Sequence, residues 1–189
     1  NIQADMPNKP LAPLNPTTPE PMGVDDLAKI FSKECSKQEL DTEHAWIDIP
    51  EEVMDMYKYY RSTPLVRAYA LEKALDTPAH IYFKNESVNP LGSHKVNSAI
   101  PQCYYCKKEG VTNVTTETGA GQWGAALSYA AKVYGLEAAV YQVKISMQQK
   151  PYRSLIMRTF GAMVEGSPSM STRAGKDIVT RDPTHPGSL

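Results

Sequence analysis

The pattern that most constrains this chain is an alternation of short strands and helices that begins near residue 63. Runs rich in β-branched and aromatic residues predict strands at residues 80–84, 112–117, 138–143 and 162–165. Helical patterns separate or follow them at residues 68–75, 95–108, 123–134 and 151–160. Strands joined through helices pair in parallel by right-handed crossovers. The sequence therefore predicts an α/β fold, with parallel sheet layers and flanking helices.

The residues before this alternation have a different composition. Six of the 15 prolines lie within the first 22 residues, which favours an extended polyproline conformation there. We expect residues 1–22 to form a proline-rich extension, residues 23–62 a helical N-terminal segment, and residues 63–189 the α/β portion.

Two helices are expected in the N-terminal segment. The first begins at Asp25, and its apolar face consists of Leu27, Ile30, Phe31 and Cys35. The second begins at Pro50 and reaches about Arg61. Farther along the chain, Pro101 lies inside the helix predicted at residues 95–108 and is expected to kink it.

Charge and hydropathy exclude two classes of partner. The 20 Lys and Arg residues nearly balance the 21 Asp and Glu residues, so the net charge of −1 gives no field that would hold a nucleic acid. No apolar run approaches the roughly 20 residues that cross a bilayer, and the first 30 residues lack the features of a signal peptide. We expect a cytoplasmic protein with no nucleic-acid or membrane partner.

The cysteines do not form a recognisable metal motif. Cys103 and Cys106 are spaced C-x-x-C, Cys35 stands alone, and no second pair or nearby histidine pair completes a zinc site. We predict thiols that pack between helices and no metal site.

The loop at residues 85–95, N-E-S-V-N-P-L-G-S-H-K, follows a predicted strand and leads into a helix. Ser93 is a plausible N-cap, which puts Lys95 in the first helical turn. The positive end of the helix dipole disfavours an ammonium ion, so this lysine is a candidate for a neutral, nucleophilic amine. A solvated surface lysine is the alternative interpretation.

A second loop at residues 115–124, T-T-E-T-G-A-G-Q-W-G, also connects a strand to a helix. Its glycines can turn backbone N–H groups inward, and the helix N-terminus adds its dipole, so the loop is typical of an anion cradle. Glu117 at its edge suits proton transfer better than anion binding. Alternatively, nearby backbone amides satisfy that carboxylate.

The same loop contains G-x-G-x-x-G, the pattern of dinucleotide-binding sites. That pattern requires an acidic residue about 20 positions on, and the next strand ends in Gln142, Val143 and Lys144 instead. An NADP site that uses Lys144 for the 2′-phosphate stays open as an alternative.

Four segments in this order resemble the tryptophan synthase β chain family, specifically its divergent second type. They are R-S-T-P-L at residues 61–65, G-S-H-K at 92–95, T-E-T-G-A-G-Q-W-G at 116–124 and Q-K-P-Y-R at 149–153. Trp123 stands where the commoner β chains have His, as in the second type. The resemblance extends over nearly the whole chain but covers only the N-terminal half of the family's length, so the chain is expected to be a partial copy.

The resemblance implies a fold-type II pyridoxal-phosphate enzyme, a lyase of tryptophan biosynthesis that replaces the hydroxyl of L-serine with indole. It implies that Lys95 binds pyridoxal 5′-phosphate covalently, that His94 lies beside the cofactor, and that Glu117 is the acid and base. The substrate carboxylate would be bound by Thr118, Gly119, Ala120, Gly121 and Gln122. A homodimer is implied for the full-length protein, and an α subunit is a possible partner.

Three alternatives to this function remain open at the level of sequence. Water in place of indole would give serine deamination, and the chain could also be a non-catalytic binding fragment or an NADP-binding domain. The glycine-rich loop that holds the cofactor phosphate in the family is absent from these residues. We therefore expect the 189-residue chain alone to bind the cofactor weakly and not to turn over serine.

Overall fold

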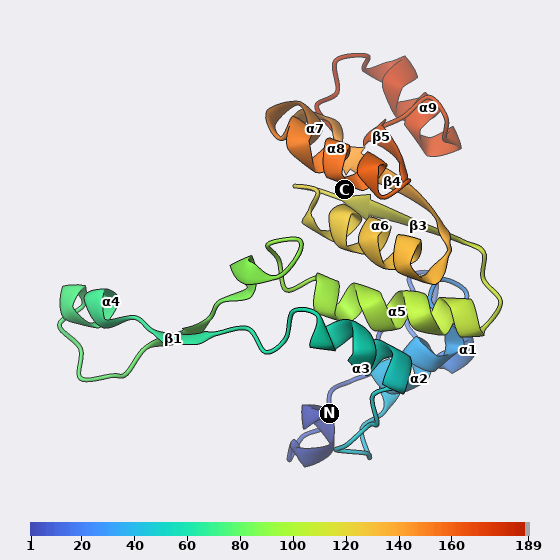
Figure 1. The fold of residues 1–189 in the computed structure, drawn as a ribbon. Coiled ribbons are helices and arrows are strands. Elements are labelled where there is room, and N and C mark those ends of the chain that lie inside the picture. The colour runs from blue at the N-terminus through green and yellow to red at the C-terminus, as the bar shows by residue number, and fades with distance from the viewer. Residues whose placement is uncertain (188–189) are drawn as a thin grey trace.

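The computed structural model describes residues 1–187 and shows a body of helices around a small sheet, with one arm that projects from it (Figure 1). Within these residues no helix is both long enough and apolar enough to cross a membrane. In chain order the elements are η1 (Ile2–Asp5), α1 (Val24–Leu27), α2 (Lys33–Leu40), α3 (Glu51–Lys58), β1 (Leu65–Arg67), α4 (Tyr69–Ala74), β2 (Tyr82–Lys84), η2 (Glu86–Val88), α5 (Val96–Lys108), β3 (Asn113–Thr118), α6 (Gln122–Tyr134), β4 (Glu137–Val143), α7 (Lys144–Gln149), α8 (Pro151–Thr159), β5 (Met163–Ser167) and α9 (Arg173–Arg181).

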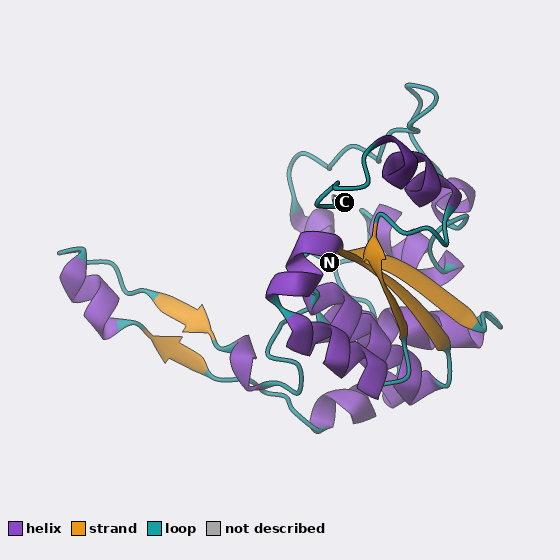
Figure 2. Cartoon of the chain, turned by 90° about the horizontal axis from the view of Figure 1, so that it is seen from above, coloured by secondary structure: helices purple, strands orange, loops and turns teal. Residues whose placement is uncertain are grey.

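The body contains a parallel sheet in the order β3-β4-β5. Thr118 at the end of β3 is level with Gln142 of β4, which is level with Gly166 of β5. Helices α6 and α8 cover one face, where Ala125 and Met157 pack against the strands in a fully buried cluster. Figure 2 shows the three strands with the helices around them. The predicted α/β fold with a parallel sheet is confirmed.

The strand predicted at residues 80–84 is not part of that sheet, and this detail of the prediction is wrong. β2 instead pairs antiparallel with β1, and Leu65 lies opposite Lys84. Together with α4 the two strands form the projecting arm in Figures 1 and 2. The three-residue strand β1 has no periodicity that reveals it in the sequence, and only α4 and two short linkers separate it from its partner.

The single helix expected from Asp25 through Cys35 is also wrong. α1 ends at Leu27, and Ser32 starts α2 by accepting a hydrogen bond from the Cys35 amide at 3.2 Å. The residues between the two helices include Ile30 and Phe31, which are 74% and 53% exposed. The helix expected from Pro50 is α3. The division at residues 22 and 62 stays a prediction.

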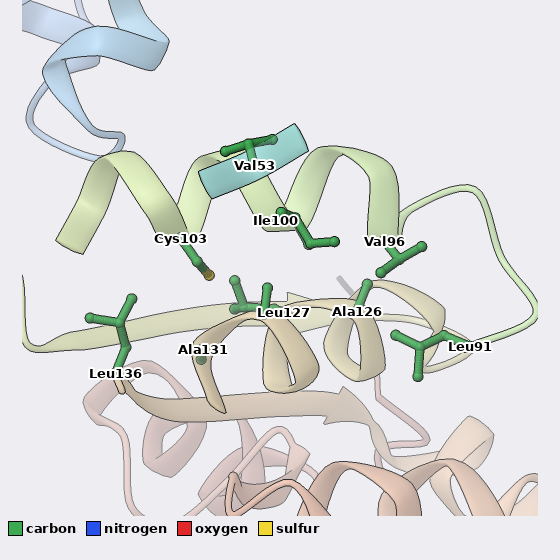
Figure 3. Close-up of a cluster of buried hydrophobic side chains, with 11 residues drawn as sticks. Val53, Leu91, Val96, Ile100, Cys103, Ala126, Leu127, Ala131 and Leu136 are labelled. Atoms are coloured by element: carbon green, nitrogen blue, oxygen red, sulfur yellow. The ribbon is translucent and has the colours of Figure 1, made fainter. Parts of the chain in front are cut away.

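The main core lies between α5 and α6. Figure 3 shows Val96, Ile100 and Cys103 of α5 facing Ala126 and Leu127 of α6. Val96 and Ala126 lie near each other at one end of the core, and Cys103 lies toward the end where Ala131 and Leu136 are found, so the two helices run in the same direction. Their N-termini therefore lie at the same end of the molecule.

Pro101 lies inside α5, and the helix continues through it to Lys108. A proline has no N–H, so the carbonyl of Asn97, four residues earlier, loses its helical donor. The Tyr57 hydroxyl of α3 donates to that carbonyl at 2.5 Å. A tertiary hydrogen bond thus replaces the missing helical one.

We predict that Tyr57→Phe lowers the free energy of unfolding by about 1–3 kcal/mol, the cost of leaving a shielded acceptor without a donor. Urea denaturation of the full-length protein measures this, with Tyr59→Phe as control because Tyr59 is 80% exposed. In a Pro101→Ala background residue 101 regains its N–H, so the cost of Tyr57→Phe should shrink. An equal cost in both backgrounds would contradict the explanation.

Candidate active site

Lys95 lies at the junction of the first loop and α5. It is the N-cap residue, so the helix begins one residue later than the sequence predicted, and its amide donates to the Ser93 hydroxyl at 3.4 Å. The Lys95 side chain is half-buried, and its Nζ has no hydrogen-bond partner in residues 1–187. An amine at this position is free to meet a ligand.

The loop that carries Lys95 is braced by a buried asparagine. The Asn89 carboxamide accepts from the amides of Leu91 and Ser93, at 3.0 and 3.3 Å, and donates to the Ser93 carbonyl at 2.8 Å. These bonds close the chain between residues 89 and 93 into one compact turn. Lys95 follows that turn by two residues.

Glu86 holds the compact turn at residues 89–93 in place. Its carboxylate accepts hydrogen bonds from Thr63 at 2.7 Å, Asn97 at 3.1 Å and Asn89 at 3.2 Å. These donors, that of Thr63 first, hold the pKa of Glu86 below its usual value, although partial burial opposes them. Tyr60, in the turn after α3, donates to the Asn97 side chain at 3.0 Å, and Tyr57 of α3 donates to the Asn97 carbonyl. The loop is thus connected through Glu86 to α5 and through Asn97 to α3.

The second loop presents a row of unpaired amides. No acceptor in the described part of the chain takes the backbone N–H groups of residues 119–123, whereas the Gly124 amide donates to the Thr118 hydroxyl at 3.3 Å. Thr118 and Gly121 are buried, Gly119, Gln122 and Trp123 are half-buried, and Ala120 is exposed. These amides stand at the N-terminus of the 13-residue helix α6, where an anion is stabilised. We call residues 119–123 the cradle.

Two glycines make this geometry possible. Gly121, the N-cap of α6, has a φ of 91°, and a Cβ there would lie 2.9 Å from the Arg153 Cβ. A Cβ at Gly124 would lie 2.7 Å from Val140 and 2.8 Å from Met157. Gly121 therefore provides the left-handed turn of the cradle, and Gly124 lets α6 approach β4 closely.

Glu117 faces away from α6. Its neighbour Thr118 packs toward Gly124, and successive side chains of a strand point to opposite faces. Glu117 is exposed on the other face, and within residues 1–187 its carboxylate neither accepts a hydrogen bond nor pairs with Lys95. The alternative interpretation was that nearby backbone amides donate to the Glu117 carboxylate, and residues 1–187 contain no such hydrogen bond. His94 is likewise exposed beside Lys95.

The structure brings two of the predicted parts to one end of the body. The parallel α5 and α6 place Lys95 and the cradle at neighbouring helix N-termini, and the cradle follows directly from the end of β3. Ligands of parallel sheets bind at this end of the strands. An amine and a row of free amides can together hold a small molecule with a carbonyl and an anionic group.

Cys35 lies on α2, and Cys103 and Cys106 lie on α5. Burial raises the pKa of Cys103 to about 12 and also raises the pKa values of Cys35 and Cys106. All three are free thiols. No group of three or more His, Cys, Asp or Glu side chains in residues 1–187 is arranged to hold a metal ion.

Several residues that contact the cradle have no role that the sequence predicts. Gln142 of β4 is fully buried, and its Oε1 accepts from the Ser154 hydroxyl of α8 at 3.0 Å. Arg153 packs on Gly121 and donates to the Leu91 carbonyl at 3.5 Å. The Q-K-P-Y-R segment at residues 149–153 was the sequence signal that could have pointed to Arg153. Only the folded structure shows that Arg153 contacts Gly121 and Leu91.

We predict that Gly121→Ala destabilises the protein more than Gly110→Ala. Both glycines have positive φ, 91° and 80°, so each alanine costs about 1–2 kcal/mol of backbone strain. Only at residue 121 does the new methyl also collide with a neighbour, which adds about 1–3 kcal/mol, since nothing lies within 4 Å at Gly110. Equal losses in a denaturation experiment on the full-length protein would show that Arg153 moves aside freely.

Comparison with known proteins identifies the family of this chain. A family model described as "Pyridoxal-phosphate dependent enzyme" matches residues 56–183. The tryptophan synthase beta chain 2 of Thermotoga maritima is 51% identical over 189 residues, which is all of this chain and 44% of that protein. The tryptophan synthase beta chain 2 of Pyrococcus furiosus is 52% identical, again over all of this chain and over 42% of that protein. The chain thus spans less than half the length of these relatives.

Solved structures share the fold at lower identity. A pyridoxal 5′-phosphate-dependent aspartate racemase aligns with a TM-score of 0.52 at 22% identity, over 74% of this chain and 45% of that chain. The serine racemase of Dictyostelium discoideum aligns with a TM-score of 0.51 at 22% identity, over 70% and 43% of the two chains. The fold-type II class expected from the sequence is confirmed. This chain therefore belongs to the pyridoxal-phosphate-dependent enzyme family and resembles, over its full length, the N-terminal part of tryptophan synthase β chains of the second type.

Proposed function

We propose that the full-length protein replaces the hydroxyl group of L-serine with indole, forming L-tryptophan in amino-acid biosynthesis. The observation that carries this proposal is the half-buried, unpaired amine of Lys95 at the same end of the body as the free amides of residues 119–123. An enzyme that acts on an amino acid through a carbonyl cofactor needs an amine that binds the cofactor and a site that binds the carboxylate of the substrate. About 50% identity to tryptophan synthase β chains supports this substrate pair.

The residues present fit the part of pyridoxal phosphate that reacts. Lys95 supplies an amine for its aldehyde, and His94 is the neighbouring residue that would lie beside it. The cradle suits one anionic group, and we assign it to the substrate carboxylate. When bound, the cofactor supplies an electron sink that stabilises negative charge at the substrate Cα.

The protein's own residues then bind the substrate and move protons. Amides of residues 119–122, with Thr118 at their start, hold the serine carboxylate and orient the Cα–H bond. Nζ of Lys95 is the base that accepts the Cα proton, and the Glu117 carboxyl donates a proton to the departing hydroxyl oxygen. The homodimer expected for the full-length protein, and the association of an α subunit, stay predictions.

Serine deamination is the competing function, since water can take the place of indole. Assays of tryptophan and pyruvate, with serine alone and with serine plus indole, distinguish the two. Tryptophan as the main product with indole supports the proposal, and pyruvate at the same rate in both assays contradicts it. Neither product, with no bound cofactor, would favour a non-catalytic or NADP-binding role.

Lys95→Ala in the full-length protein should abolish the covalent attachment of pyridoxal phosphate. Borohydride reduction followed by peptide mass spectrometry should find the cofactor mass on the Lys95 peptide of the wild type and nowhere in the variant. Lys132→Ala is the control, because Lys132 is exposed in the last turn of α6, at the end away from the cradle. Attachment at another lysine of the Lys95→Ala protein would overturn the assignment.

Glu117→Gln should leave cofactor binding intact and lower turnover of serine and indole by about 10²-fold or more, the usual size of a general acid–base effect. The substitution keeps the shape of the side chain but removes its ionisable group. Glu137→Gln is a suitable control, since Glu137 is exposed at the opposite end of β4. Near-normal turnover in Glu117→Gln would assign the proton transfer to another group.

A further inference from the structure

The first turn of α8 is fixed next to Gly121 of the cradle. The buried Ser154 hydroxyl donates to Oε1 of the fully buried Gln142, and Met157 anchors the next turn in the core. Nε2 of Gln142 has no partner in the described part of the chain and would lie 3.0 Å from a Cβ at Gly121. The backbone of residues 153 and 154 is therefore held at a defined place relative to the cradle.

From this place, the side chain of Arg153 reaches both loops. Its Cβ and Cγ would be 2.9 and 3.3 Å from a Cβ at Gly121, so its stem passes over the glycine turn of the cradle. Its Nη1 donates to the carbonyl of Leu91 in the loop that carries Lys95. None of the ion pairs formed within residues 1–187 involves Arg153, so its guanidinium is not drawn toward a carboxylate.

The residue that Arg153 contacts belongs to the rigid part of the lysine loop. Leu91 is buried beside Ala126 of α6 (Figure 3), and its amide is bound by Asn89 in the turn at residues 89–93. A displacement of Leu91 therefore displaces the turn, and with it Lys95 two residues farther on.

We infer that Arg153 is a positioning residue, which ties the lysine loop to the cradle and so sets where the Lys95 amine stands relative to the bound carboxylate. The inference rests on the function proposed above for these two loops. A hydrogen bond at 3.5 Å is long, so the packing of the Arg153 stem on Gly121 and the hydrogen bond from its Nη1 to the Leu91 carbonyl act together. Misplacement of a reacting group by about 1 Å can cost up to 10²-fold in rate.

The test compares Arg153→Met with Arg158→Met in the full-length holoenzyme. Methionine keeps an apolar stem but removes the donor, and Arg158 is a matched control because it lies on the same helix and donates to the Val164 carbonyl at 3.1 Å, away from both loops. We expect kcat for serine to fall at least about tenfold in Arg153→Met, with cofactor content unchanged, and to stay near wild type in Arg158→Met. Arg153→Lys, which retains one donor, should recover part of the loss.

Hydrogen exchange gives a readout that needs no turnover. Amides of residues 91–98 should exchange faster in Arg153→Met than in Arg158→Met and the wild type. Equal kcat and equal exchange in the two methionine variants would overturn the inference, as would a fall in kcat without faster exchange. If the wild type forms no tryptophan, the proposed function fails, yet faster exchange confined to Arg153→Met would still establish the tie between the loops.

Discussion

The close, parallel packing of α5 against α6 is the constraint on which the candidate site depends. Ala99 meets α6 from one side, and Ala126 and Ala130 meet α5 from the other, all fully buried. Small side chains along this contact let the helix axes approach, and interiors packed this densely do not slide. Because the helices run in the same direction, their N-termini stay together. The lysine loop and the cradle are simply the segments that enter these two helices.

Apolar and polar contacts around that core have different structural roles. Apolar side chains fix the direction and spacing of the helices, but they do not determine the path of a loop. Hydrogen bonds centred on Glu86 and Asn89 determine the path of the lysine loop. Asn97 of α5 joins this network, and it also accepts hydrogen bonds from Tyr57 of α3 and from Tyr60 in the turn after α3. The hydrogen bonds to the Glu86 carboxylate lower its pKa in the folded protein. They therefore stabilise the folded protein at pH values above the ordinary pKa of a glutamate. This stabilisation is lost as the pH falls through the lowered pKa of Glu86.

The sequence predicted those parts of the structure that depend on local patterns. The strands of the parallel sheet follow from β-branched runs and the helices between them from helical patterns, and each has a strong local signal. In the structure Gly135 and Gly161, both with positive φ, follow the ends of α6 and α8. The cradle was predictable for the same reason, because glycines before a helix free their amides. The roles of Lys95, Glu117 and the other site residues stay predictions.

Elements with a weak or a competing local signal were missed. The antiparallel pairing of the arm depends on which strand lies nearest in space, and the break between α1 and α2 depends on a serine cap that outweighs an apolar pattern. The contacts of Arg153 with Gly121 and Leu91 join segments that are 32 and 62 positions apart in the sequence. Such contacts are set by the packing of α8 on the sheet, which no short motif encodes.

The cysteines, one buried and two half-buried, have a chemical consequence for a protein of a pyridoxal-phosphate-dependent family, whose cofactor is an aldehyde. Thiolates add to carbonyls readily, and a reactive one nearby would compete with an amine for the same carbon. The raised pKa values of Cys35, Cys103 and Cys106 keep these sulfur atoms protonated at neutral pH, and a protonated thiol is a poor nucleophile. The raised pKa values thus lower the share of thiolate, so these thiols compete less with an amine such as that of Lys95 for an aldehyde carbon.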